Sequence, residues 1–468
     1  MRRRQFIAAA AAFAGAGRVF GAASEGAPSA RFGVLSDIHC TEDGDSLSIF
    51  EHALRYFDEM KCDGVVLCGD MADYGLADEL KSVGDTWFKV FPGGMRSDGA
   101  PIAQLFIYGD HDMGGYMHKR VEAKNHPEKV IPLIGPAAAW EAAFHEKWAP
   151  IQVKTVKGFT FILAHHPMHD EESKFGQRIP GAAEALAKYA PKNGKPFFFM
   201  QHRIFKDTVG GHWAWGQEDG ESRAALNAFP NAIALCGHGH LEAQDETCIW
   251  QDEFTAVEVP SLRYVSIRGG RENSRGHDDV PSKMNPAINT GGGKQGMLMD
   301  VFRNRIVIAK RDFIHDCEVA APWVIPLPFP SGRPYNHETR ARNERAPQFP
   351  EGAEVVVKRR KGKDRAGADQ DLFVVLVDPV HSTAATPRAF DYEVSAEISS
   401  FGVTRIAKQK RFYSYNGHFP EQYDTKPTGF NFAKSELSAQ TEKIRFHVRP
   451  CAMFGAKGRP ISSSWLPY

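Results

Sequence analysis

The stretch GVLSDIHC, residues 33–40, joins a short apolar run to an aspartate and a histidine that are two residues apart. Four later stretches have the same arrangement, in which an apolar run predicted to be a strand ends at carboxylates or imidazoles. They are VVLCGDMAD (65–73), LFIYGDHDM (105–113), FFFMQHRIF (197–205) and IALCGHGH (233–240). Because the carboxyl ends of the strands in an open α/β sheet converge on one crevice, we expect these polar residues to meet there.

The region from Arg31 to about Phe313 alternates such runs with stretches of helical spacing, which predicts an α/β domain. Helices are predicted at Leu47–Met60 and Ala182–Tyr189. Strands are predicted at Phe32–Ser36, Val65–Cys68, Ala103–Tyr108, Phe159–Ala164, Pro196–Met200, Ala232–Cys236 and Phe254–Val259, with a closing hairpin at Met297–Val301 and Arg305–Lys310. Several strands are unbroken apolar runs, which is typical of strands covered on both faces.

The 468-residue chain is long enough for more than one domain, and its composition changes after the first. Seven prolines between residues 321 and 350 predict an extended linker without regular structure, at 318–350. Short alternating segments follow, which predict an all-β sandwich at 351–468. Its stretch RFHVRPCAMFGAKGRPISS, residues 445–463, resembles the late strands of fibronectin type III-like modules.

The N-terminus is predicted to be an export signal and leader, residues 1–30, which leaves 31–317 for the first domain. A basic start, MRRRQFI, is followed by a short alanine-rich run and small residues, the pattern of a secretory signal. RRQFI, residues 3–7, resembles the twin-arginine motif, so we expect export to the periplasm or the exterior by that route. The alternative is an uncleaved anchor, although the apolar run is short for a membrane span.

Composition excludes several classes of function. Lys plus Arg equals Asp plus Glu, 57 against 57, so no overall charge favours nucleic acid or an anionic membrane. The seven cysteines form no C-x-x-C pair, which speaks against a zinc knuckle or a dithiol site. The chain has no G-x-S-x-G, so a serine hydrolase has no local support.

The donor types at the strand ends favour metal ions. Oxygen and imidazole without thiolate suit Mn, Fe, Zn or Ni. The donors are too many for one ion, which indicates two divalent or mixed-valence ions bridged by a carboxylate. Such a pair clamps the attacking and leaving oxygens of an in-line phosphoryl transfer.

The ordered set D-x-H, G-D, G-D-H-D, a lone His after an apolar strand and G-H-x-H resembles the calcineurin-like metallophosphoesterases, from Arg31 to about Phe313. The resemblance implies a two-sheet sandwich flanked by helices that holds two ions. It implies one ion held by Asp37, His39, Asp70 and His240, with Asp70 bridging to a second held by Asp110, His202 and His238. It also implies that His111 protonates or stabilises the leaving oxygen and that Asp112 orients His111.

Two positions depart from the family pattern. Asp110 stands where the family has Asn, which adds a negative charge. This charge either tunes a working site toward a more highly charged ion, or weakens the site. The string His165-His166-Pro167-Met168-His169 competes with His202 as the source of the lone ligand. We favour His202, because the Ala182–Tyr189 helix and the Pro196–Met200 strand lead into it, and assign His165 and His166 to a loop beside the site.

The predicted activity is hydrolysis of a phosphate ester, monoester or diester, by attack of a metal-bound hydroxide. One alternative is hydrolysis of a P–O–P anhydride of the nucleotide-sugar type, and another is a non-catalytic binding protein with a degenerate site. The predicted partner is the phosphate-ester substrate, with no nucleic-acid signal and no membrane span once the signal is removed. The C-terminal sandwich is expected to shape the cleft or to dock on a surface polymer.

Overall fold

The structure is a computed structural model, and it describes residues 26–41, 44–114, 124–212, 214–274, 284–285, 287–288, 293–329, 332–363, 367–418 and 428–468. The predicted export signal lies almost entirely outside these residues. The chain forms two compact units. One comprises Ala27–Ile267 and Thr290–Thr339, and the other contains Arg268–Asn289 and Arg340–Tyr468. No helix among the described residues is both long and apolar enough to cross a membrane.

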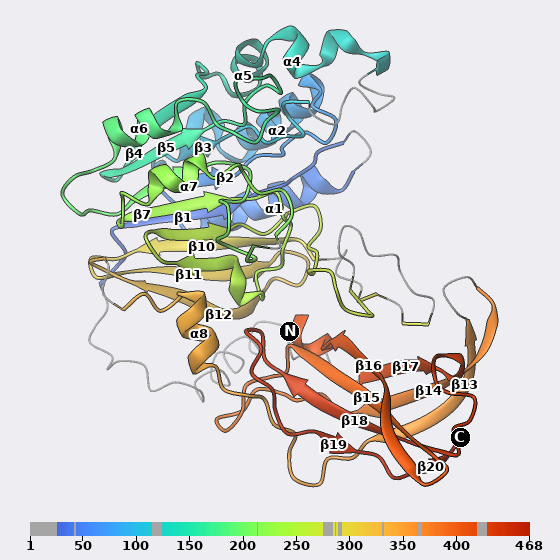
Figure 1. The fold of residues 1–468 in the computed structure, drawn as a ribbon. Helices are drawn as coiled ribbons and strands as arrows, with labels where there is room; N and C mark the ends of the chain where they lie inside the picture. Colours follow the sequence, from blue (N-terminus) through green and yellow to red (C-terminus); the bar gives the residue numbers. More distant parts are fainter. Residues whose placement is uncertain are drawn as a thin grey trace, which may run out of the picture. The chain divides into compact units, whose positions relative to one another are not determined.

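The first unit contains two six-stranded sheets (Figure 1). One has the order β12 (Cys317–Pro326), β11 (Arg305–Asp312), β10 (Gln295–Val301), β1 (Ala30–Leu35), β2 (Gly64–Leu67) and β3 (Ala103–Phe106). The other has the order β4 (Ile151–Val156), β5 (Phe159–Ala164), β6 (Phe197–Met200), β7 (Ala232–Cys236), β9 (Thr255–Glu258) and β8 (Ile249–Gln251). Strands β1 to β3 are parallel, as are β5, β6, β7 and β9. Their carboxyl ends therefore share one edge of each sheet.

A buried apolar core joins the two sheets, with Phe32 and Val66 from the first and Phe161 and Phe198 from the second. The Phe32 and Phe161 rings meet edge to face, with their centroids 4.9 Å apart. Helices α1 (Ser46–Glu59), α2 (Ala77–Val90), α4 (Ile131–Ile134) and α5 (Pro136–Phe144) accompany the first sheet, and α6 (Ala182–Tyr189) and α7 (Glu221–Leu226) the second. The predicted two-sheet α/β sandwich flanked by helices is thus confirmed.

Strand β1 shows how the sequence sets the layers. Phe32 and Val34 point into the core between the sheets, and Leu35 packs on the helical side. Gly33 also faces that side, where an added Cβ would lie 2.4 Å from the Phe57 ring of α1. Only glycine lets α1 approach the strand this closely.

The expectation of no regular structure in the proline-rich stretch is wrong at two places. β12 carries Pro322 and Pro326, and α8 (His337–Asn343) follows it. Proline cannot donate a backbone hydrogen bond, so it is tolerated where one strand edge is unpaired. Within the described part of the chain, β12 is the outermost strand of its sheet and pairs with β11 alone, which explains why it forms despite its prolines.

The second unit is an antiparallel sandwich, as predicted for the C-terminal part. One sheet has the order β13 (Val356–Lys363), β14 (Asp369–Val377) and β17 (Thr428–Ala433). The other has the order β16 (Val403–Tyr413), β15 (Asp391–Ser400), β18 (Lys443–Cys451) and β19 (Ile461–Ser462), with β20 (Leu466–Pro467) also on β18 and α9 (Tyr415–His418) after β16. Phe373, Tyr392, Phe430 and Phe446 fill the core between them.

Candidate metal centre

Seven predicted ligands lie where five strands of the first unit end. Asp37 and His39 follow β1, Asp70 follows β2, Asp110 follows β3, His202 follows β6, and His238 and His240 follow β7. All seven are buried. Two clusters of donor atoms result, one of Asp37, His39 and His240 and the other of Asp70, Asp110, His202 and His238. His165 and His166, the rival candidates, lie in neither cluster.

The larger cluster is built around two carboxylates. Asp110 Oδ1 lies 3.0 Å from His202 Nε2 and 3.1 Å from His238 Nδ1. Asp70 Oδ2 lies 3.2 Å from the same nitrogen of His202. The two imidazoles face each other, with 3.2 Å between His238 Nδ1 and His202 Nε2.

The smaller cluster has a similar geometry. Asp37 Oδ1 lies 3.1 Å from His240 Nε2, and His39 Nε2 lies 3.1 Å from that same atom of His240. Asp70 Oδ2 is also 3.5 Å from His39 Nε2. One oxygen of Asp70 is therefore close to donors of both clusters, which is the position of a bridging ligand.

The backbone at these residues is strained. Asp37, His39, Asp70, His238 and His240 have φ values of 54°, 45°, 52°, 74° and 53°, in the left-handed region that non-glycine residues seldom adopt. Each such residue is destabilising by on the order of 1–3 kcal/mol and persists only where its surroundings fix it. Other residues of the unit, among them Lys61, His145 and Lys157, also have positive φ. Five of the seven predicted ligands share this conformation, however, which indicates that their side-chain positions serve a function.

Gly109 shows how tightly the cluster is packed. An added Cβ at this position would lie 2.1 Å from Asp70 Oδ1, so no larger residue fits beside that carboxylate. The glycine allows β3 and β2 to bring Asp110 and Asp70 together.

The donor set fits metal ions. Asp37 Oδ1 and Asp110 Oδ2 are buried and make no hydrogen bond with any described residue. Unsatisfied buried polar atoms are rare, and a bound ion is one of the accepted explanations. Carboxylate oxygen and imidazole nitrogen are also the ligands that Mn, Fe and Zn share.

The pKa values of the donor side chains also fit a site for metal ions. Burial alone would raise the pKa of Asp37 and Asp110, but the neighbouring imidazoles, chiefly His240 and His238 respectively, hold both pKa values well below the usual range. Burial alone would lower the pKa of His39, yet the neighbouring carboxylates, chiefly Asp37 and Asp73, raise it to about 10. The clustered carboxylates thus stay ionised and hold positive charge beside them. Metal ions would supply that charge in place of the imidazole protons.

Backbone carbonyls and carboxylates orient the imidazoles. His202 Nδ1 donates to the Cys68 carbonyl oxygen at 2.7 Å, and His240 Nδ1 donates to the Tyr264 carbonyl oxygen at 3.1 Å. His39 Nδ1 lies 3.1 Å from Asp73 Oδ1. In each case the Nε2 atom is left to face the cluster, as in protein metal sites where the second ring nitrogen fixes the tautomer.

His111 contacts Asp73, a residue that the sequence motifs alone do not single out. His111 Nδ1 lies 2.8 Å from the Asp73 carbonyl oxygen and 3.6 Å from Asp73 Oδ1, and its ring centroid is 4.5 Å from that of His39. Asp73, His39 and His111 form a third group of donor atoms. The signal was present, because Asp73 comes three residues after Asp70 in the second strand-end motif.

Asp112 occupies a different place from the one expected for an orienting residue. Its carboxylate accepts hydrogen bonds from the backbone N–H groups of Gly109, Ala72 and Met71, at 2.7, 2.7 and 3.2 Å. Burial and the charge of Asp70 outweigh these bonds and raise the pKa of Asp112 to about 7. Asp112 thus ties the loop after β2 to the loop after β3, and its role toward His111 stays a prediction.

His165 and His166 differ in their positions. His165 accepts from the Tyr108 N–H at 3.1 Å through Nδ1, and its Nε2 lies 3.1 Å from Gln152 Oε1, so it is a fully bonded core histidine. His166 is nearer the cluster, with its ring centroid 6.3 Å from that of His202. His166 therefore lies beside the cluster, as the sequence predicts for this loop.

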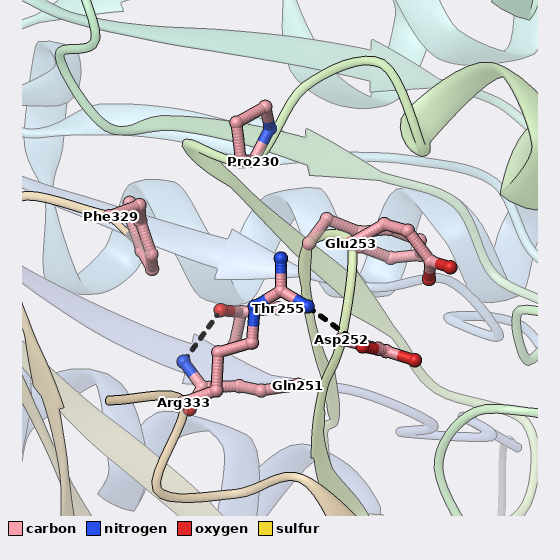
Figure 2. Close-up of a pocket in the computed structure, with 8 residues that line it drawn as sticks. Pro230, Gln251, Asp252, Glu253, Thr255, Phe329 and Arg333 are labelled. Carbon is pink, nitrogen blue, oxygen red and sulfur yellow. Dashed lines mark hydrogen bonds and ion pairs between the residues drawn. The ribbon is translucent and has the colours of Figure 1, made fainter. Parts of the chain in front are cut away.

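A hollow elsewhere on the first unit does not serve as the site. It lies at the turn between β8 and β9, where the Arg333 guanidinium reaches Asp252 Oδ1 at 2.8 Å (Figure 2). Its volume is about 10 Å³, room for a single water. None of the predicted site residues lines it.

Residues 30–242 match the family model described as calcineurin-like phosphoesterase. A search of curated proteins gives no match. Solved structures similar to this chain include a dimetal phosphatase from Danio rerio, with 10% identity and a TM-score of 0.36 over 64% of this chain and 99% of that one. The GAP50 anchor of the inner membrane complex of Plasmodium has 10% identity and a TM-score of 0.37 over 64% and 89%. Vacuolar Protein Sorting 29 from Cryptosporidium parvum has 12% identity and a TM-score of 0.29 over 64% and 98%.

The family match ends just after the last predicted ligand, His240, so it spans all seven. The family model and the buried clusters of aspartate and histidine agree on the same chemistry. Residues 30–242 of the first unit thus resemble a calcineurin-like phosphoesterase domain, and they contain buried Asp/His clusters of the kind that hold divalent metal ions.

Proposed function

We propose that the chain hydrolyses phosphate esters at a dinuclear metal centre made of the seven buried donors. The observation that carries this proposal is the place of Asp70, whose Oδ2 lies 3.5 Å from His39 Nε2 and 3.2 Å from His202 Nε2. The smaller cluster would hold one ion and the larger cluster the other, with Asp70 close enough to serve both. The full set would be Asp37, His39, Asp70 and His240 for one ion, and Asp70, Asp110, His202 and His238 for the other.

The ions, when bound, supply an activated water and positive charge for the phosphoryl oxygens. The chain's own contribution beyond the ligands comes from His111. Its Nδ1 donates to the Asp73 carbonyl oxygen at 2.8 Å, which fixes the orientation of the ring. The ring centroid of His111 lies 4.5 Å from that of His39, and in its doubly protonated form His111 would give the Nε2 proton to the oxygen of the departing alcohol.

The test is hydrolysis of bis-p-nitrophenyl phosphate by the full chain, freed of metal and then reloaded with Mn, Fe, Zn or Ni. Asp70→Asn should lower the rate by about 100-fold or more, because such ions supply several kcal/mol of stabilisation to the transition state. The metal content of each protein is measured in parallel. Asp70→Asn should retain less than the two ions bound by the unchanged chain.

Asp85→Asn is the matched control, since Asp85 lies exposed on α2 and, among the described residues, pairs with Lys81 of its own helix. It should keep both rate and metal. A folded protein that binds no metal, or that binds two ions and hydrolyses no ester, would refute the proposal. Turnover of a nucleotide sugar in the absence of ester turnover would replace the ester by a P–O–P anhydride.

A further inference from the structure

Two aromatic side chains lie directly on the candidate ligands, one on each cluster. The Trp215 ring is stacked on His238, with centroids 4.6 Å apart and planes inclined by 16°. Trp215 is nevertheless 45% exposed. Gly216 makes this approach possible, because a Cβ at that position would lie 2.1 Å from the His238 ring.

Tyr264 takes the corresponding place at the other cluster. Its ring centroid is 4.4 Å from that of His240, with planes inclined by 41°, and its carbonyl oxygen accepts from His240 Nδ1 at 3.1 Å. Tyr264 is also 45% exposed.

The exposed area of these rings lies where the organic part of an ester must go. The phosphate group of a bound ester belongs at the carboxylate and imidazole donors, which are buried. Its organic group must then extend from that centre toward solvent, past the residues that border it. A large indole or phenol surface offers a planar substituent broad contact at low entropic cost, and aromatic pairs gain further from offset stacking.

We infer that Trp215 and Tyr264 select the substrate, and that its organic group carries a planar aromatic ring, as in an aryl or nucleoside ester. This inference rests on the proposed phosphoesterase function and adds the substrate class. Both residues act on the substrate as binding surfaces, in addition to supporting the imidazoles beneath them. The alcohol group of a small alkyl ester would offer neither ring a planar surface to stack on.

The test compares two non-hydrolysable ligands with the same head group, phenylphosphonate and methylphosphonate. Their dissociation constants are measured by calorimetry on the metal-loaded full chain, so the readout does not depend on turnover. Phenylphosphonate should bind more tightly. Trp215→Ala and Tyr264→Ala should each weaken phenylphosphonate by about five- to tenfold, the range of one lost aromatic pair, and leave methylphosphonate within about twofold.

Trp215→Phe and Tyr264→Phe keep a ring and should retain most of the preference for phenylphosphonate. Tyr189→Ala removes another exposed aromatic residue of the same unit, at the end of α6, and should change neither constant. Metal content is recorded for every variant.

Equal weakening of both phosphonates, with or without loss of metal, would overturn the inference, because a ring that only supports its imidazole affects both ligands alike. Unchanged binding of phenylphosphonate would overturn it too. Failure of the proposed function has a different appearance: neither phosphonate binds the unchanged chain and no ester is hydrolysed.

Discussion

Burial makes His165 a neutral residue of the core. Tyr108, Trp140 and Trp148 surround its ring, with centroids 5.5, 4.7 and 5.6 Å away. Burial, helped by the charge of Lys154, lowers the pKa of His165 from 6.5 to about 3. Its hydrogen bond from the Tyr108 N–H holds the end of β3, just before the loop that carries Asp110 and His111.

This pKa predicts a pH-dependent stability. Between pH 6.5 and pH 3 the unfolded chain binds a proton at His165 that the folded chain does not, so the free energy of unfolding falls as the pH falls. The loss attributable to this residue between pH 7 and pH 4 is on the order of 3 kcal/mol. His165→Gln should have a lower free energy of unfolding at pH 7, because the substitution disturbs two hydrogen bonds. Between pH 7 and pH 4, however, its free energy of unfolding should fall by about 3 kcal/mol less than that of the unchanged chain.

Chemical denaturation at both pH values measures this difference. All other titrating groups are common to the two proteins and cancel in the comparison. His126→Gln, at an exposed histidine, should leave the pH dependence of stability as it is. The same loss of stability in His165→Gln as in the unchanged chain would show that His165 titrates normally.

At the scale of single residues, the sequence predicts the donor side chains well, but it predicts the residues that contact and orient these donors less well. The seven predicted ligands stood out because each follows an apolar strand, a pattern that needs no knowledge of side-chain contacts. Asp73 and Tyr264 were not named, since their importance depends on contacts with His39 and His240 made across the fold. Nothing in the local sequence distinguishes such a residue from an ordinary loop residue.

At the scale of elements, the contact between α2 and α5 depends on Gly84. Gly84 lies within α2, and an added Cβ would lie 2.0 Å from the Ala143 carbonyl oxygen of α5. In an exposed helix, replacing glycine by alanine stabilises by up to about 1 kcal/mol. Here the overpacking should outweigh that gain, because such insertions destabilise by about 1–3 kcal/mol.

Gly84→Ala should therefore lower the free energy of unfolding by about 1–2 kcal/mol, as the balance of these two effects. Denaturation of the full chain would measure it. Ser82→Ala, on the same helix, is the control, since the Ser82 hydroxyl bonds only the Asp78 carbonyl oxygen one turn earlier. An equal or higher stability of Gly84→Ala would show that α5 can move away from α2 at little cost.

The strands were easier to predict than the elements around them. β5 and β7 have the predicted bounds, because buried parallel strands are continuous apolar runs with polar ends. β4 and α2 were not predicted; half of the β4 residues carry polar side chains, and the buried positions of α2 include Glu79. β12 was missed because its two prolines argue against a strand unless its edge position is known.

Across the whole molecule, the chain leaves the first compact unit and returns to it before reaching the C-terminal sandwich. Residues Arg268–Asn289, between β9 and β10 in the sequence, belong to the second unit. There Arg271 Nε donates to Asp391 Oδ2 at 2.8 Å, and Asn273 exchanges two hydrogen bonds with Tyr413, at 2.7 and 3.0 Å. Asp391 is fully buried. No change in composition marks this segment, so the sequence alone predicts that it belongs to the domain at 31–317.

This connectivity predicts that the phosphoesterase part does not fold well when the sandwich is removed. A chain cut after Thr339 retains Arg268–Asn289 but lacks β13 to β20, the strands with which that segment bonds. Met284, which packs on Leu372 and Ala433, would become exposed. We expect a lower melting temperature and increased binding of a hydrophobic dye, because newly exposed apolar surface and unpaired polar groups both disfavour the folded state.

In the matched control, the same cut is combined with replacement of residues 268–289 by a Gly-Ser linker of equal length, which should recover most of the loss in melting temperature. A cut chain that melts at the temperature of the intact one and binds no more dye would show that the segment needs no partner.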